Sequence, residues 1–160
     1  MSCNKNRGFT LIEMLVTLAI IGILASVIYP SYTRYVVSSY RAQAQADMLE
    51  FATAMEKHKA TTFSYKGAAG SKSSPSDTGE PWVFVGHSPA DGAAADRRYT
   101  LTIEAVANNG RSYEIKATPK HTGSSDPMAD GMMSIFSDGR KAYDADKDGA
   151  YAADEYCWSC

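Results

Sequence analysis

The sequence predicts an α+β fold in which a long N-terminal helix, transmembrane in its first half, packs on a C-terminal antiparallel β-sheet. Two observations predict the helix: residues 8–30 form an apolar run, and apolar side chains then recur every three or four positions up to Met55. A third predicts the sheet, because residues 99–106 and 111–118 alternate between apolar and polar side chains around a turn. The residues after the apolar run are enough for one small domain.

The apolar run, GFTLIEMLVTLAIIGILASVIYP, is long enough to cross a bilayer as a helix. Lys5 and Arg7 precede it without any acid, which favours a cytoplasmic N-terminus. A secretory signal peptide has a shorter apolar region and a small-residue cleavage site, and no such site follows this run. A plain uncleaved anchor stays an alternative, but it does not explain Glu13. A carboxylate in hydrocarbon costs about 2.5–3.5 kcal/mol at mid-bilayer, so it usually has a partner or a role.

Residues 8–13, GFTLIE, followed by the apolar run, resemble the class III signal of type IV pilins and type II secretion pseudopilins. The resemblance implies that prepilin peptidase cuts between Gly8 and Phe9 and that the new amino group of Phe9 is N-methylated. Glu13 would then act in assembly. Its carboxylate would pair with the positive amine of a neighbouring subunit, which removes the cost of two isolated charges in hydrocarbon.

An amphipathic helix is expected to continue over residues 31–60. Its apolar stripe comprises Tyr32, Val36, Tyr40, Ala44, Met48, Phe51 and Met55. Gly22 and Pro30 are weak points, because proline removes a backbone hydrogen bond and glycine is a poor helix former. In type IV pilins the stretch between matching residues can lose helical order in the assembled fibre. The resemblance therefore implies a helix break over residues 22–30, and a simple kink is the alternative.

Residues 61–98 are rich in Gly, Ser, Pro and Asp and predict a loop around a core candidate, Trp82–Val85. Residues 99–143 predict a β-meander with hairpins over 99–118 and 133–143. This order resembles the pilin fold, and segments 29–35, 41–45 and 99–119 further resemble minor pilins of the PilE class. The resemblance divides the chain into a leader (1–8), a transmembrane and assembly helix (9–30) and a soluble pilin domain (31–160).

The C-terminal segment 144–155, DADKDGAYAADE, fits the twelve-residue calcium loop of an EF-hand. The expected Ca²⁺ ligands are the side chains of Asp144, Asp146, Asp148 and Glu155 and the carbonyl of Ala150. Only five residues follow Glu155, so flanking EF-hand helices are not expected. A solvated acidic turn is the alternative. Calcium bound here would be structural, because it would neutralise crowded carboxylates.

Cys157 and Cys160 form an even pair in a domain expected to be exported, which favours a disulfide between them. A redox CxxC motif opens a helix after a strand, whereas this one closes the chain. A zinc site needs two more ligands, and His58, His87 and His121 lack ligand spacing. Cys3 leaves with the leader and is assigned no role.

Composition argues against two classes of function. The chain carries 16 Lys and Arg against 18 Asp and Glu, and has no basic stripe with interleaved aromatic residues. It therefore gives no ground to predict nucleic-acid binding. No Ser/His/Asp or Cys/His arrangement, phosphate loop or carboxylate pair in a plausible cleft predicts an enzyme. No cofactor is expected apart from calcium.

The resemblance implies a structural subunit, a minor pilin of a type IV pilus. Its partners would be other pilin subunits, prepilin peptidase and the inner-membrane assembly platform. It would insert once into the inner membrane with its N-terminus cytoplasmic, and then pass into the extracellular fibre. There it would prime or join the tip complex, or present a surface for adhesion or DNA uptake. Two alternatives stay open: a type II secretion pseudopilin and a membrane-anchored calcium-binding adhesion domain.

Overall fold

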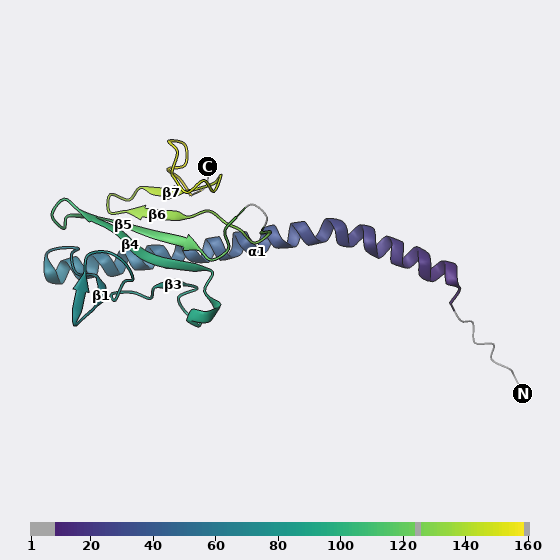
Figure 1. Cartoon of the computed structure of the whole chain (residues 1–160), viewed down its shortest axis with the longest axis horizontal. Helices are drawn as coiled ribbons and strands as arrows, with labels where there is room; N and C mark the ends of the chain where they lie inside the picture. Colours follow the sequence, from purple (N-terminus) through teal and green to yellow (C-terminus); the bar gives the residue numbers. More distant parts are fainter. Residues whose placement is uncertain (1–8, 124–125, 159–160) are drawn as a thin grey trace, which may run out of the picture.

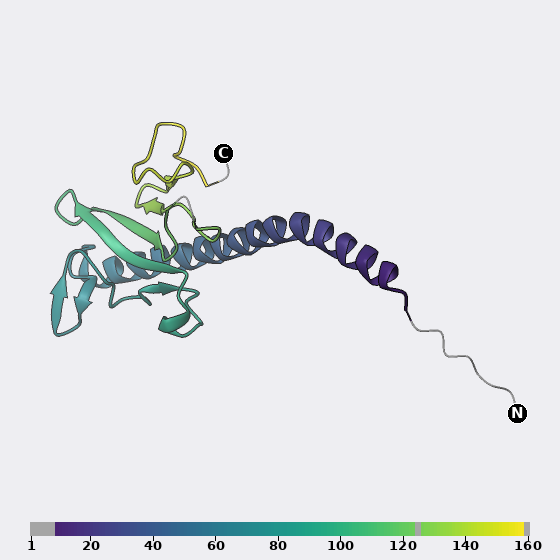
Figure 2. The same cartoon turned by 45° about the vertical axis from the view of Figure 1, so that its right-hand side comes forward.

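A computed structural model describes residues 9–123 and 126–158, and it confirms the predicted α+β fold. Helix α1 (Leu11–Thr62) packs its second half against a sheet, while its first half projects away from the rest of the molecule (Figure 1 and Figure 2). The antiparallel sheet follows chain order: β3 (His87–Ser88), β4 (Tyr99–Ala107), β5 (Ser112–Pro119), β6 (Met133–Phe136) and β7 (Lys141–Tyr143). We call the part of the molecule formed by this sheet, its loops and the second half of α1 the head.

The core of the head lies between α1 and one face of the sheet. The helix contributes Ala44, Met48, Phe51 and Met55, and the sheet contributes Leu101, Ile103, Ile115, Ala117, Met133 and Ile135. Burying each large side chain stabilises the fold by roughly 1.5–3 kcal/mol. The predicted stripe is longer than the sheet that covers it. Tyr40 is only partly buried, and Tyr32 is 65% exposed because it lies beyond the head.

The segment expected as a loop, 61–98, contains short regular elements, which corrects that expectation. It holds β1 (Ala69–Ser71) and β2 (Ser74–Ser76), which pair with each other, as well as β3 and a 3₁₀ turn, η1 (Ala94–Asp96). Bonds to other segments hold these elements. The Gly70 N–H donates to the Glu80 carbonyl at 2.8 Å, and the Leu101 N–H donates to the Gly86 carbonyl at 3.0 Å. Such pairings are not visible in the local composition.

The core candidate within this segment is split between interior and surface. Phe84 stacks on Phe51 of α1 with ring centroids 5.3 Å apart. Trp82 is 38% exposed, and its indole N–H donates to the Gly67 carbonyl at 2.6 Å. The indole N–H of Trp82 therefore has a hydrogen-bond acceptor at the surface. Phe84 is partly buried and packs against the core.

The β4–β5 turn docks against the end of α1. Asn108, Asn109 and Gly110 all have positive φ, as a tight hairpin turn requires. The Tyr65 N–H donates to the Gly110 carbonyl at 3.0 Å. A Cβ at Gly110 would lie 2.0 Å from the Ser64 hydroxyl oxygen, so this close approach requires glycine.

Candidate functional site

The first half of α1 presents apolar side chains to its surroundings. α1 is long and apolar enough to cross a membrane by length and composition, and the most apolar stretch of the helix is not buried by the rest of the protein. Ile21, Leu24 and Ile28 are each more than half exposed. A helix with this much exposed apolar surface needs lipid or other apolar helices around it.

Glu13 caps the helix that carries it. Its carboxylate accepts hydrogen bonds from the backbone N–H and the hydroxyl of Thr10, both at 2.8 Å. The Thr10 hydroxyl oxygen in turn accepts from the Glu13 N–H at 3.3 Å, which completes a capping box. The Glu13 carboxylate therefore already has donors within its own chain, at the helix end where a negative charge is favoured.

The structure describes only one of the two residues at the predicted cleavage site. Phe9 is 81% exposed and lies just before the capped helix. Gly8 lies outside the described residues. Cleavage and N-methylation at this position stay predictions.

The helix runs without interruption through Gly22 and Pro30 in the single chain. Hydroxyl groups bond to carbonyls around the proline, since Ser31 donates to the Val27 carbonyl at 3.2 Å and Thr33 to the Pro30 carbonyl at 3.0 Å. The break is therefore not a property of the isolated chain. A loss of helical order in the assembled fibre stays a prediction.

The C-terminal loop brings together three of the four carboxylates of the predicted calcium loop. One oxygen from each of Asp144, Asp146 and Asp148 lies within 4.8 Å of the other two. The Asp148 N–H lowers the pKa of Asp146, but partial desolvation and the nearby Asp148 and Glu155 carboxylates outweigh it and raise that pKa overall. Crowding of this kind is relieved by a cation.

Glu155 is not among the three grouped carboxylates, although its charge is near enough to raise the pKa of Asp146. One of its oxygens accepts from the backbone N–H groups of Ala145 at 2.7 Å and Asp146 at 3.3 Å, and the other accepts from Ala152 at 2.9 Å. These backbone donors lower the pKa of Glu155. Glu155 closes the loop through its backbone partners. Cys160 lies outside the described residues, so its disulfide with Cys157 stays a prediction.

A buried aspartate, Asp130, joins the helix to strands β4 and β7 of the sheet. Arg41 of α1 donates to its carboxylate through Nε at 3.0 Å and through a terminal nitrogen at 2.5 Å. The hydroxyls of Tyr99 on β4 and Tyr143 on β7 also donate to it. Burial alone would raise the pKa of Asp130, but the bonds from Arg41 and Tyr99 and the charge of Arg41 lower it below its ordinary value.

No motif in the sequence indicates Asp130, which stands between the two predicted hairpins. Nor does any motif indicate Asp47, a polar position in the helix pattern that is 4% exposed. Asp47 accepts from the Ser88 hydroxyl at 2.5 Å and from the Ala90 N–H at 3.2 Å. Both carboxylates join segments far apart in the chain, and no local signal marks them.

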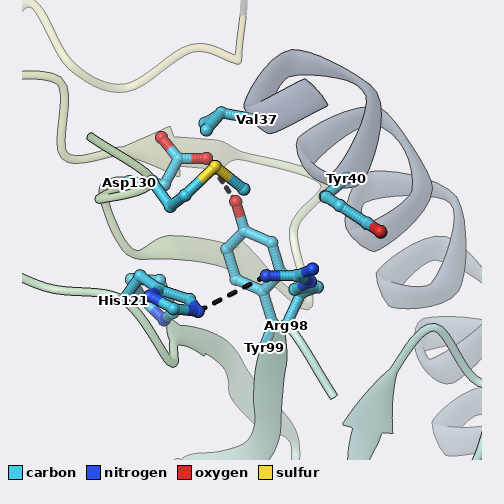
Figure 3. A pocket seen from close by; sticks show the side chains of 8 residues that line it. Val37, Tyr40, Arg98, Tyr99, His121 and Asp130 are labelled. Atoms are coloured by element: carbon cyan, nitrogen blue, oxygen red, sulfur yellow. Dashed lines mark hydrogen bonds between the residues drawn. The ribbon is translucent and has the colours of Figure 1, made fainter. Parts of the chain in front are cut away.

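A small cavity lies beside Asp130, between α1 and the ends of β4 and β5 (Figure 3). Figure 3 shows the Tyr99 hydroxyl directed at Asp130 and the His121 ring directed at Arg98. The cavity volume is about 20 Å³, which is room for about one water molecule. It is a gap in the packing around Asp130 and too small for an organic ligand.

Two family models match the chain. Residues 30–130 match the model described as type IV minor pilin ComP, DNA uptake sequence receptor. Residues 3–29 match the model described as prokaryotic N-terminal methylation motif. The first match covers well over half of the chain, including most of the head.

Curated relatives show the same similarity. The chain is 38% identical over 52 residues to the type IV major pilin protein PilA of Myxococcus xanthus, covering 32% of this chain and 24% of that protein. It is 36% identical over 84 residues to the type IV major fimbrial protein FimA of Dichelobacter nodosus, covering 45% and 52%. It is 33% identical over 125 residues to the fimbrial protein EcpC of Eikenella corrodens, covering 73% and 65%.

These matches span a quarter to about two thirds of each relative's length. No solved structure matches the chain significantly.

Proposed function

Because the chain belongs to the type IV pilin family, we propose that it is a minor pilin that enters a type IV pilus after prepilin peptidase has removed residues 1–8. It inserts in the inner membrane with Lys5 and Arg7 on the cytoplasmic side. It then passes through the assembly platform into the extracellular fibre. Its role is structural, and its partners there are other pilin subunits.

The observation that carries the proposal is the first turn of α1. The Glu13 carboxylate lies in the apolar first half of α1 and is held by Thr10, one turn from the position where cleavage would create a positive amine on Phe9. The Phe9 amine of a second subunit would bring a positive charge to the Glu13 carboxylate, which already lies at the positive end of its own helix. The pair then replaces two separate charges in an apolar environment.

N-terminal sequencing of sheared fibres tests the proposal. Fibres from the native bacterium should contain this chain with N-methylated Phe9 as its first residue. A chain that keeps Met1 and is absent from every fibre would contradict the proposal. Recovery only with a type II secretion apparatus would favour the pseudopilin.

We propose DNA binding as a second function, supported by the family model for a DNA uptake sequence receptor. Arg97, Arg98 and Lys120 lie together where β4 begins and β5 ends, since the Lys120 N–H donates to the Arg98 carbonyl at 2.7 Å. Among residues 9–123 and 126–158, none of these three side chains forms an ion pair with an acid. Arg97 donates to the Ala94 carbonyl and Arg98 contacts His121 and the Tyr40 ring, but these partners do not neutralise their charges. Cations at one edge that no acid neutralises suit contacts with phosphates.

Salt-dependent binding of duplex DNA to the full-length protein in detergent tests this second function. Replacing Arg97, Arg98 and Lys120 by alanine should reduce the slope of log affinity against log salt by up to about 2.7, since each phosphate contact contributes about 0.9. Replacing the exposed Lys57 and Lys72 serves as the control. Equal slopes for both variants and the wild type would contradict a role for the three cations.

We propose finally that the C-terminal loop binds calcium through Asp144, Asp146 and Asp148. Their mutual proximity and the raised pKa of Asp146 support this proposal. Calcium there would neutralise the carboxylates and fix the end of the chain to the sheet. A calcium-dependent thermal melt, described in the Discussion, tests it.

A further inference from the structure

Phe63, the residue that ends α1, combines two unfavourable properties. Its backbone is left-handed, with φ 60° and ψ 14°, and its N–H donates to the Lys59 carbonyl at 2.7 Å. Glycine is the usual residue in this helix-ending conformation, and a bulky side chain there is an outlier. The side chain is also 91% exposed, more than any other large apolar side chain in the described residues.

The surrounding contacts impose this conformation on Phe63. Thr62 on one side donates its hydroxyl to the Ser64 carbonyl at 2.7 Å. On the other side the Tyr65 N–H is fixed to the Gly110 carbonyl, and the Ser64 hydroxyl oxygen accepts from the Lys66 N–H at 3.1 Å. The chain reversal is therefore rigid. It would form at least as easily with glycine or asparagine at position 63, so the phenyl ring adds nothing to the fold that these contacts do not already supply.

The polar groups around the ring are satisfied within the chain. The Tyr65 hydroxyl donates to Glu56 at 2.6 Å, and Lys59 donates to the Tyr65 hydroxyl at 3.2 Å. Lys66 donates to the Asn109 side chain at 3.1 Å. Among the described residues, the ring of Phe63 is the most exposed large apolar side chain, so a partner for it must offer an apolar recess.

The position of Phe63 indicates which partner can reach it. It follows the last turn of α1, at the opposite end of the helix from the membrane-spanning half (Figure 1). The 52 residues of α1 span about 78 Å at 1.5 Å per residue, well beyond the thickness of a bilayer. Lipid therefore cannot cover the ring. In a membrane-anchored subunit this end points away from the membrane, on the side where the proposed function places the extracellular fibre.

We propose that Phe63 is an apolar anchor that inserts into a recess on the neighbouring pilin subunit farther from the membrane. This inference rests on the proposed function. It places the end of the head that is farthest from the membrane in contact with the next subunit along the fibre. A rigid aromatic side chain held on an ordered turn loses little conformational freedom on binding, which is typical of interface hot spots.

Replacing Phe63 with asparagine or glycine separates this role from a structural one. Either variant should raise the Tm of the isolated full-length protein by about 2–4 °C, because the backbone strain is relieved. The same variants should reduce the amount of the chain in sheared fibres at least fivefold, about 1 kcal/mol in equilibrium terms. Val85→Asn, which removes an apolar side chain that is 38% exposed elsewhere on the head, is the matched control and should leave incorporation unchanged.

The outcomes are distinguishable. A Phe63→Asn variant that is stabilised yet enters fibres like wild type overturns the inference and leaves the proposed function intact. Absence of the wild-type chain from fibres overturns both. As a second measurement, p-benzoylphenylalanine at position 63 should photo-crosslink to another pilin in intact fibres, and the lack of a pilin adduct would also overturn the inference.

Discussion

Arg41 and Asp130 form an ion pair although 89 residues separate them in the sequence, with the Arg41 Nε 3.0 Å from the carboxylate. The Asp130 side chain is 4% exposed and that of Arg41 is 29% exposed. The guanidinium also lies 4.3 Å from the centroid of the Tyr143 ring. This pair joins α1 to the segment before β6, so it helps to hold the helix against the sheet.

Replacing Asp130 with asparagine should destabilise the protein by about 3 kcal/mol, because it leaves Arg41 partly buried without a counter-charge. Urea denaturation of the full-length protein in detergent measures the change. Asp138→Asn removes the exposed pair with Arg140 and should cost far less, because solvent screens an exposed ion pair. Equal effects of the two substitutions would contradict the central role of Asp130.

Protonation of Asp130 is expected to destabilise the fold in acid. The folded-state pKa of Asp130 is lowered from its ordinary value of 3.8, so folding favours the ionised form. This contribution is fully present above the unfolded pKa and is lost as the pH falls through the folded pKa. The stability difference between wild type and Asp130→Asn should therefore be full above about pH 5 and shrink as the pH falls below 3.8 in urea titrations. A constant difference would show that Asp130 does not titrate in this way.

The capping box predicts different effects for its two members. Glu13→Gln removes the charge and should leave membrane insertion intact while reducing incorporation into fibres at least tenfold, as expected for the loss of an apolar ion pair. Thr10→Val keeps the charge and the Thr10 backbone donor, and loses the two bonds of the hydroxyl, one to the Glu13 carboxylate and one from the Glu13 N–H. It should reduce incorporation only a few-fold. Quantitative immunoblots of membranes and sheared fibres measure both, and normal incorporation of Glu13→Gln would argue against the charge pair.

Calcium should raise the Tm of the protein, and a chelator should reverse the rise. Calcium at about one hundred times its Kd would add about 2.7 kcal/mol of stability. A variant with Asp146→Asn and Asp148→Asn should lose the shift, whereas Asp138→Asn, outside the loop, should keep it. Identical melts of the wild type with calcium and with chelator would exclude a structural calcium site here.

Gly110 and Gly139 have similar positive φ angles but different surroundings. Alanine substitutions at the two positions therefore distinguish the cost of a steric clash from the cost of backbone strain. Gly110 has φ +83° and Gly139 has φ +87°, but a Cβ would be 2.0 Å from Ser64 at Gly110 and would meet nothing within 4 Å at Gly139. Gly139→Ala should cost about 1 kcal/mol from strain alone, and Gly110→Ala should cost clearly more. Thermal melts compare them, and equal costs would mean that the turn shifts to relieve the contact with Ser64.

Periodic sequence features predicted most of this fold. The apolar run indicates the exposed half of α1, and the stripe from Ala44 to Met55 indicates the half that packs on the sheet. Alternation located β4 and β5 because each of these strands has one buried and one more exposed face. These signals are local, because the order of apolar and polar side chains along a helix or strand shows which of its faces is buried.

Features that depend on distant partners could not be predicted. Asp47 looks like one more polar residue on a helix, and only the fold brings Ser88 against it. Asp130 likewise acquires its donors from α1, β4 and β7, three elements that the sequence does not place around it. The end of α1 shows the same limit, since no helix-stop rule favours phenylalanine at a left-handed position.

The uninterrupted course of α1 has a mechanical consequence. A pulling force on the head is transmitted directly to the first half of the same helix, which in the proposed fibre lies in the membrane or among neighbouring helices. Within the described residues no loop separates the two halves of α1. The helix resists extension through its backbone hydrogen bonds, and at Pro30 one of these is missing because proline has no N–H. Under tension, α1 should therefore lengthen first around Pro30, while the ion pair at Arg41 keeps the head on its own part of the helix.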